Sequence, residues 1–172
     1  MLYRFQIELS DVDRGIYEPL DFRVAQHPSE SIPYLLTRTL AYALSYRAQL
    51  EFSPKGLADP DGPTLLVAGQ AGAVDLWIEI GNPSARKLHK AAKAAREVEI
   101  YTYKNPELLV AEIAAGDVHR ASEIRIHAFD SLALAQIEHG LQKNNRWSLL
   151  VQEGRVSVDG PGVSVSFEIR RF

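Results

Sequence analysis

The hydrophobic pattern in the middle of the chain switches repeatedly between the period of a strand and the period of a helix. Strand-like and helix-like segments alternate as residues 74–80, 85–96, 98–100, 106–115 and 124–128. A strand–helix–strand–helix–strand order is typical of parallel strands that are joined by crossover helices. The pattern therefore predicts an α/β fold in which helices cover a central sheet.

Both ends of the chain carry the alternating pattern of antiparallel strands. Residues 3–9 alternate between apolar and polar side chains, and residues 20–24 alternate again after a polar turn. The last third, residues 147–169, consists of short alternating runs separated by glycine-containing turns. Together these patterns predict a three-layer α/β domain with a mixed sheet, crossover helices and antiparallel hairpins at both ends. We expect a single domain over residues 1–172, because this length is usual for one domain.

Two further helices are predicted from apolar spacing and end signals. Residues 32–44 repeat apolar side chains at intervals of three and four, with Ser29 or Ser31 as the cap. A second capped helix is predicted over residues 130–140. Residues 52–73 are rich in proline and glycine and form the longest stretch that we predict to be irregular.

Composition excludes several classes of protein. The chain has no cysteine, which rules out a disulfide scaffold and thiolate zinc sites. Its 19 Lys and Arg residues against 22 Asp and Glu give a net charge of -3, which disfavours coating nucleic acid through overall charge but allows a local basic patch. No apolar run approaches the roughly 18 residues of a membrane helix, and the amino terminus lacks a signal-peptide pattern. We therefore expect a cytoplasmic protein with no membrane partner.

Two acids share one face of the strand predicted at residues 74–80. The period of a strand places Asp75, Trp77 and Glu79 on one face and only apolar side chains on the other. A strand that is covered on both faces is normally apolar throughout, so the two carboxylates depart from that rule. We expect them to lie close enough to share one hard cation or to raise each other's pKa. The alternative is that Asp75 caps a loop and Glu79 pairs with a helical lysine.

Glu79 also lies where ligands gather in α/β proteins. It stands shortly before the segment 81–84, at the predicted carboxyl end of its strand, and ligands bind beyond such ends. Ser84 opens the next helix, whose amide groups are able to face an anion. Trp77, between the two acids, is placed either to stack on a base or to pack in the core.

The helix that follows is basic along its whole length. Residues 84–96 contain no acid and five bases, which are Arg86, Lys87, Lys90, Lys93 and Arg96. Lys87 flanks the apolar face of the helix, so its amine is able to reach the strand end by snorkelling, whereas Lys90 lies further round the helix. A run of bases is usually a solvated face, and this is our interpretation of Lys93 and Arg96. For Lys87 and Lys90, the solvated and the functional interpretations both stay open.

Carboxylates, a divalent ion and a lysine together favour phosphodiester chemistry. A divalent cation polarises a phosphoryl oxygen and generates hydroxide, and a lysine offsets the charge that develops in the transition state. The sequence offers no competing constellation, because it has no nucleophile elbow, phosphate loop or dinucleotide fingerprint. Its five histidines include no i, i+4 pair on one helix, so a histidine zinc site is not expected.

Several motifs resemble those of the bacterial YaeQ family, over nearly the whole chain. They are Asp11-Val12-Asp13-Arg14, His27-Pro28-Ser29-Glu30, Asp75-Leu76-Trp77-Ile78-Glu79-Ile80-Gly81, and Pro83 followed by Arg86, Lys87 and Lys90-Ala91. The resemblance implies a variant of the PD-(D/E)xK nuclease fold, with a core like that of restriction endonucleases. The family itself is largely without an established biochemical activity.

The resemblance also implies roles for individual residues. Glu30 resembles the helical acid of that superfamily, Asp75 and Glu79 the strand acids, and Lys90 the lysine. The superfamily's lysine normally stands two residues beyond the second acid, where this chain has Gly81. The resemblance therefore implies that the lysine would have to come from the following helix. Pro60-Asp61 resembles the first half of the superfamily motif but falls in the irregular stretch. A simpler alternative for Glu30 is that it interacts with the dipole of the helix it precedes.

Two functions from different classes are therefore expected. The first is a Mg²⁺-dependent (or Mn²⁺-dependent) nuclease or nuclease-like phosphodiesterase, in which Glu30, Asp75 and Glu79 hold the metal and Lys90 or Lys87 contacts the scissile phosphate. The second is a noncatalytic regulatory or interaction domain that keeps the nuclease-like fold and binds a protein or nucleic acid. With a net charge of -3, nucleic-acid binding is expected to be weak and sensitive to salt.

Overall fold

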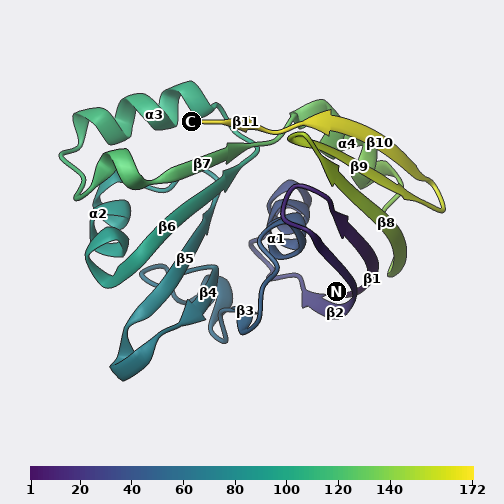
Figure 1. Cartoon of the computed structure of the whole chain (residues 1–172), viewed down its shortest axis with the longest axis horizontal. Helices are drawn as coiled ribbons and strands as arrows, with labels where there is room; N and C mark the ends of the chain where they lie inside the picture. The colour runs from purple at the N-terminus through teal and green to yellow at the C-terminus, as the bar shows by residue number, and fades with distance from the viewer. The chain divides into compact units, whose positions relative to one another are not determined.

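The computed structural model describes residues 1–172 and contains two sheets and four α-helices (Figure 1). Its contacts cluster into two compact units, residues 1–44 with 129–170 and residues 45–128 with 171–172. The mixed α/β class is confirmed, but the prediction of one mixed sheet is wrong. The strands from the two ends of the chain pair with each other in a sheet of their own, and therefore do not extend the central one. The expectation of a single domain over residues 1–172 stays a prediction.

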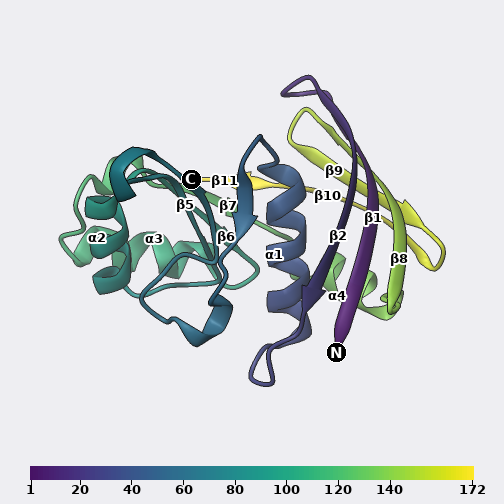
Figure 2. The same cartoon turned by 90° about the horizontal axis from the view of Figure 1, so that it is seen from below.

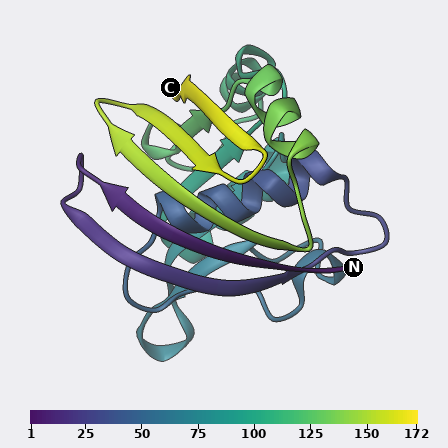
Figure 3. The ribbon, with the colours of Figure 1, turned by 90° about the vertical axis from the view of Figure 1, so that its right-hand side faces the viewer.

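The first unit is a five-stranded sheet with the strand order β10-β9-β8-β1-β2 (Figure 3). Its elements are β1 (Leu2–Asp11), β2 (Ile16–Ala25), α1 (Ile32–Leu44), α4 (Ser131–His139), β8 (Asn144–Gln152), β9 (Arg155–Gly160) and β10 (Val163–Glu168). The opening hairpin β1–β2 and the closing meander β8–β9–β10 are antiparallel, as the sequence predicts. A parallel pairing of β1 with β8 joins them into one sheet.

Aromatic residues on the inner face of this sheet form much of its core. The predicted alternation is observed in β1, where Phe5, Ile7 and Leu9 are buried. The Phe5 ring stacks on Phe22 at a centroid distance of 5.7 Å and lies 5.1 Å from the Trp147 ring. The period-two pattern therefore fixes the register, since a slip by one residue would expose every one of these side chains.

The Asp11-Val12-Asp13-Arg14 stretch forms hydrogen bonds that stabilise turns of the first unit. Both carboxylate oxygens of Asp13 accept backbone N–H groups from the β8–β9 turn, from Glu153 at 2.7 Å and from Gly154 at 3.0 Å. The buried Asp11 carboxylate binds Arg14, whose guanidinium also donates to the carbonyl of Ala43 at the end of α1. This motif therefore stabilises the first unit and supplies no group to the candidate site.

The second unit is a six-stranded sheet with the order β11-β7-β6-β5-β4-β3, and α2 and α3 lie on one side of β5, β6 and β7 (Figures 1 and 2). Its elements are β3 (Leu50–Phe52), β4 (Leu65–Ala68), β5 (Val74–Ile80), α2 (Ala85–Ala94), β6 (Ala95–Thr102), α3 (Pro106–Ala115), β7 (Arg125–Ala128) and β11 (Arg170–Arg171). The three strands β5, β6 and β7 are parallel neighbours. The predicted strand–helix–strand–helix–strand order is confirmed.

Two local predictions for this unit are wrong. The stretch 52–73 is not wholly irregular, because β4 lies within it and pairs antiparallel with both β3 and β5. Single-turn 3₁₀ helices at Gly56–Ala58 and Gln70–Gly72 account for part of the remainder, and a third lies at Ala121–Glu123. The helix predicted over 85–96 ends at Ala94, and β6 begins at Ala95 without a loop. Apolar spacing does not mark this change, because alanines fit both periods.

The helices begin at the caps that the sequence indicates. The hydroxyl of Ser31 accepts the amide of Tyr34 at the start of α1, so Ser31 rather than Ser29 is the cap. Asn105 and Asp130 cap α3 and α4 in the same way. The longest helix, α1, has 13 residues, and none of the helices is both long enough and apolar enough to span a bilayer.

Gly140 provides a test of packing in the first unit. A Cβ at this position would clash with the carbonyl oxygen of Gly162 and lie 2.6 Å from Val163. We predict that Gly140→Ala lowers the free energy of unfolding by about 1–3 kcal/mol, because the β9–β10 turn must move. Urea denaturation measures this, with Gln136→Ala on the exposed face of α4 as the control. Equal stability of both variants would contradict the close approach.

Candidate functional site

Glu79 is a buried carboxylate at the carboxyl end of β5, and only 2% of the residue is exposed. The face of β5 that carries it is the one covered by α2 and α3, because Trp77 on that face packs with Leu88 and Leu109. The core interpretation of Trp77 is thereby favoured over base stacking. Its indole N–H also donates to Glu79 Oε2 at 2.6 Å. The carboxylate is therefore buried beneath a helix with one oxygen already bound.

The other oxygen of Glu79 is held by the following helix. Lys87 Nζ lies 2.8 Å from Glu79 Oε1, and the lysine side chain keeps 24% of its surface exposed. Ser84 fixes the start of this helix by accepting the amide of Lys87. Lys87 therefore reaches the strand end by the snorkelling course that its place on the helix predicts, and Glu79 pairs with a helical lysine, as in the alternative interpretation.

Burial raises the pKa of Glu79. Removal from water disfavours the charged carboxylate and raises the pKa of Glu79, whereas the Lys87 charge and the bonds from Lys87 and Trp77 oppose that rise without cancelling it. Lys87 is therefore the main group that keeps a negative charge tolerable at this position.

Asp75 does not join this cluster, and the expectation that the two strand acids share a cation stays a prediction. Asp75 and Glu79 are four positions apart on β5, and at the rise of a strand their Cα atoms lie about 13 Å apart. Asp75 lies instead near the amino end of β5, where its Oδ1 would be 2.7 Å from a Cβ added at Gly69. The alternative interpretation that Asp75 caps a loop stays a prediction.

Lys90 is directed away from Glu79. Its side chain is 63% exposed, and the nearest acid is Asp61 at 4.0 Å. An exposed pair at this separation contributes little to stability. The contact shows, however, that the loop with Pro60-Asp61 lies beside α2. Of the two candidate lysines, Lys87 is the one that contacts a strand acid.

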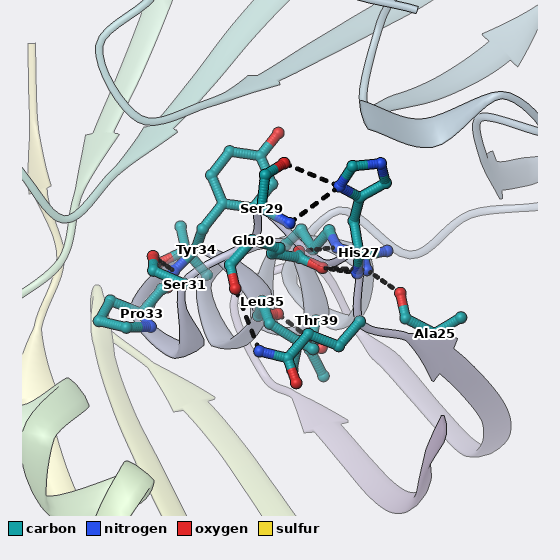
Figure 4. Close-up of polar contacts among 12 residues, drawn as sticks. Ala25, His27, Ser29, Glu30, Ser31, Pro33, Tyr34, Leu35 and Thr39 are labelled. Carbon is teal, nitrogen blue, oxygen red and sulfur yellow. Dashed lines mark hydrogen bonds and ion pairs between the residues drawn. The ribbon is translucent and has the colours of Figure 1, made fainter. Parts of the chain in front are cut away.

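Glu30 belongs to the first unit, whereas Asp75 and Glu79 belong to the second. Within its own unit the Glu30 carboxylate is fully engaged (Figure 4). Arg38 donates to both of its oxygens, at 2.5 and 2.9 Å, and the backbone N–H of His27 donates to Oε1 at 3.1 Å. An ion pair with Arg38, rather than a helix dipole, therefore compensates the charge of this buried acid. The prediction that it binds metal stays a prediction.

The remaining polar groups of His27-Pro28-Ser29-Glu30 are used locally. His27 Nδ1 lies 2.7 Å from the Ser29 hydroxyl and accepts the Ser29 amide at 3.1 Å (Figure 4). Gln26 donates to the carbonyl of Glu30, and Arg38 donates to that of Ala25. The motif therefore closes the connection between β2 and α1.

The described residues contain no group of three or more histidine or acidic side chains arranged to hold a metal ion. Mg²⁺ requires several oxygen ligands in near-octahedral geometry. Both oxygens of Glu79 and both oxygens of Glu30 accept bonds from groups of this chain, and Asp75 lies at the other end of β5. The oxygens of Glu30 and Glu79 are thus already engaged within their own units, and the prediction that Glu30, Asp75 and Glu79 hold a metal ion stays a prediction.

Comparison with known proteins places these motifs in a family. A family model described as "YaeQ protein" matches residues 1–169. The chain belongs to the YaeQ family. A YaeQ crystal structure from Xanthomonas axonopodis pv. citri superposes with a TM-score of 0.89 at 31% identity, covering 98% of this chain and 95% of that one. The YaeQ crystal structure from Pseudomonas syringae gives the same TM-score at 27% identity, with 99% and 94% covered.

The curated YaeQ relatives carry no functional description. "Uncharacterized protein YaeQ" of Escherichia coli (strain K12) is 32% identical over 104 residues, which are 60% of this chain and 57% of that protein. The Salmonella typhi relative of the same description is 30% identical over the same length. The aligned region thus spans little more than half of these relatives, and the comparisons define the family and fold.

The YaeQ fold also contains a second buried polar cluster, which sequence reasoning missed. His127 on β7 is hydrogen-bonded to Glu99 on β6 at 2.7 Å, and Tyr101 stacks on the His127 ring. Burial raises the pKa of Glu99, but the bond and charge of His127, with Arg125 and Arg47, outweigh it and hold the pKa below its usual value. The sequence pattern that indicates this cluster is the alternation of Glu99 and Tyr101 with apolar residues on a covered strand.

Lys87→Met tests the electrostatics of Glu79. Loss of the amine raises the pKa of Glu79 further in the folded protein. The folded protein therefore loses more stability as the pH rises above 4.5, the ordinary pKa of a glutamate carboxyl. We predict a loss of about 1–3 kcal/mol in the free energy of unfolding at neutral pH and little loss near pH 4, where the carboxyl is protonated in both states. Urea denaturation across pH measures this.

Two control variants accompany this test. Lys90→Met removes a lysine from the same helix that does not touch Glu79, and we expect it to leave stability unchanged. The double variant Glu79→Gln/Lys87→Met removes both charges, and we expect it to be more stable than Lys87→Met alone at neutral pH. Equal pH profiles for Lys87→Met and Lys90→Met would contradict the pairing.

Proposed function

We propose that this chain is a noncatalytic domain with a nuclease-like core, which acts by binding a partner. In this proposal the restriction-endonuclease-like core is retained as a scaffold. The order of elements in the second unit supports such a core. Three antiparallel strands, β3, β4 and β5, are followed by α2 and then by β6, which is parallel to β5. The partner is a nucleic acid or a protein.

One observation supports this proposal above the others: both carboxylate oxygens of Glu79 are already bound by groups of its own chain. Lys87 and Trp77 bind its two oxygens at 2.8 and 2.6 Å. A hydrolytic metal centre needs carboxylate oxygens that are available to the ion, together with an open coordination position. A buried carboxylate that is compensated by a lysine and an indole N–H needs no metal to be stable. Glu30 has the same kind of compensation from Arg38.

A metal-dependent nuclease or nuclease-like phosphodiesterase is the second candidate, and the position of Glu79 favours it. Glu79 and Lys87 meet at the carboxyl end of a strand that has a parallel neighbour, where α/β proteins place their ligands. Asp61 lies beside the same helix, 4.0 Å from Lys90. For this candidate Glu79 must exchange its contacts for Mg²⁺ or Mn²⁺, and further acids must be brought to it.

Metal titration and cleavage assays decide between the two candidates. Mg²⁺ and Mn²⁺ are titrated calorimetrically into the wild type and into Glu79→Ala, with the exposed-acid variant Glu112→Ala as the control. The proteins are then incubated with labelled single- and double-stranded DNA and RNA in the presence of each metal. We predict that Glu79→Ala and Glu112→Ala give the same titration as the wild type, and that nothing is cut.

The second candidate is supported by a specific pattern of results. If the wild type binds metal, Glu79→Ala alone abolishes that binding, and the wild type cleaves a nucleic acid that Glu79→Ala leaves intact, then the noncatalytic proposal is overturned. Metal binding that all three proteins share without cleavage belongs to other surface acids and leaves the proposal standing.

A further inference from the structure

The exposed face of α2 carries a row of cations. Arg86, Lys90 and Lys93 follow one another at i, i+4 and i+7, and at 3.6 residues per turn they lie within about 60° of one another around the helix. All three are exposed, whereas Leu88 and Ala92 on the opposite side are buried in the core of the second unit. We refer to Arg86, Lys90 and Lys93 as the basic face.

The basic face is not neutralised by the rest of the chain. Arg86 and Lys93 form no ion pair, and the only acid near Lys90 is the exposed Asp61 at 4.0 Å. The helix itself contains no acidic residue. The basic face is therefore locally positive, although the whole chain has a net charge of -3.

The arrangement is unfavourable for helix stability. Arg86 and Lys87 occupy the first turn of α2, where the positive end of the helix dipole favours acids. Like charges at i, i+4, such as Arg86 and Lys90, and at i, i+3, such as Lys90 and Lys93, repel one another. Departures from local stability rules are expected at functional sites. The basic face therefore has the character of a surface that is maintained for a ligand of opposite charge.

The chemistry of the face distinguishes between anionic partners. Protein interfaces are anchored by buried aromatic or large apolar side chains, and the basic face offers none, because its exposed neighbour Ala94 is small. Binding to a phosphodiester backbone requires only cations placed along it. The absence of an apolar anchor favours a nucleic acid over an acidic protein.

We propose that Arg86, Lys90 and Lys93 of α2 bind the sugar–phosphate backbone of a nucleic acid without reading its sequence. This inference rests on the proposed function, in which the domain acts by binding, and it names both the surface and the chemical class of the partner. The site is distinct from the Glu79–Lys87 ion pair, which lies beneath the helix.

The test measures binding of a fluorescein-labelled oligonucleotide of mixed sequence, single-stranded and as a duplex, by fluorescence anisotropy over a range of KCl concentrations. The test variant is Arg86→Gln/Lys90→Gln/Lys93→Gln. The matched control is Arg23→Gln/Lys143→Gln/Arg146→Gln, which removes three exposed cations from the first unit. Both variants therefore carry the same change in net charge.

We expect the test variant to bind at least about tenfold more weakly at low salt, and its slope of log K against log[salt] to fall by about 2–3, one phosphate contact for each lost cation. The control keeps the wild-type slope. A second variant, Arg86→Glu, separates function from folding: its Tm stays equal or rises, because an acid now meets the helix dipole, while its binding weakens.

The other outcomes overturn either the binding role of the basic face, the nucleic-acid partner or the noncatalytic proposal. If the wild type binds and the test variant binds equally well, this inference fails and the proposed function stands. If the wild type binds neither probe, the nucleic-acid partner is wrong, and a protein partner is left for the proposed function. If polyglutamate displaces the oligonucleotide at equal charge concentration, the surface serves an acidic protein. If the bound probe is cleaved with Mg²⁺, the noncatalytic proposal fails and the binding surface stands.

Discussion

A carboxylate that is buried beneath a helix needs a group that compensates its charge. In the second unit of this chain, Lys87 provides that compensation for Glu79. The residue lies on the face of β5 that α2 covers, so water cannot solvate it. Lys87 extends from α2 to one oxygen, and Trp77 donates from the same strand to the other. These contacts link the helix to the strand end. They also explain how an acid is kept at a position of β5 that a helix covers.

The chain uses this arrangement twice. Glu30 and Glu79 each precede a helix, and each is bound by a cation eight residues later in that helix, Arg38 in α1 and Lys87 in α2. In both cases the carboxylate is almost fully buried and the cation is partly exposed. Two separate, locally satisfied ion pairs are a different arrangement from one shared metal site. They leave Arg86, Lys90 and Lys93 of α2 exposed.

The sequence predicts most of the fold, because its elements have clear periods and caps. The parallel order of β5, β6 and β7, the opening hairpin and the closing meander all follow from hydrophobic spacing. The division into two sheets does not follow, since the pairing of β1 with β8 joins residues more than 130 positions apart and leaves no local signal. Strand β4 was missed because glycine and proline dominate the stretch around it.

The candidate site is predictable in part. The choice of Glu79 and Lys87 follows from strand parity and helix position, and the structure brings the two together. Asp75 does not lie beside Glu79, because the two are four positions apart along the extended strand β5. The partner of Glu30 was not foreseen, because nothing in the sequence shows which face of α1 Arg38 occupies relative to the preceding connection.

The pairing of Glu79 with Lys87 is tested by anomalous diffraction from crystals of the protein grown with Mn²⁺. We predict that Lys87 Nζ lies within hydrogen-bonding distance of Glu79 and that no manganese peak lies beside that carboxylate. A manganese ion coordinated by Glu79, with Lys87 displaced, would contradict it.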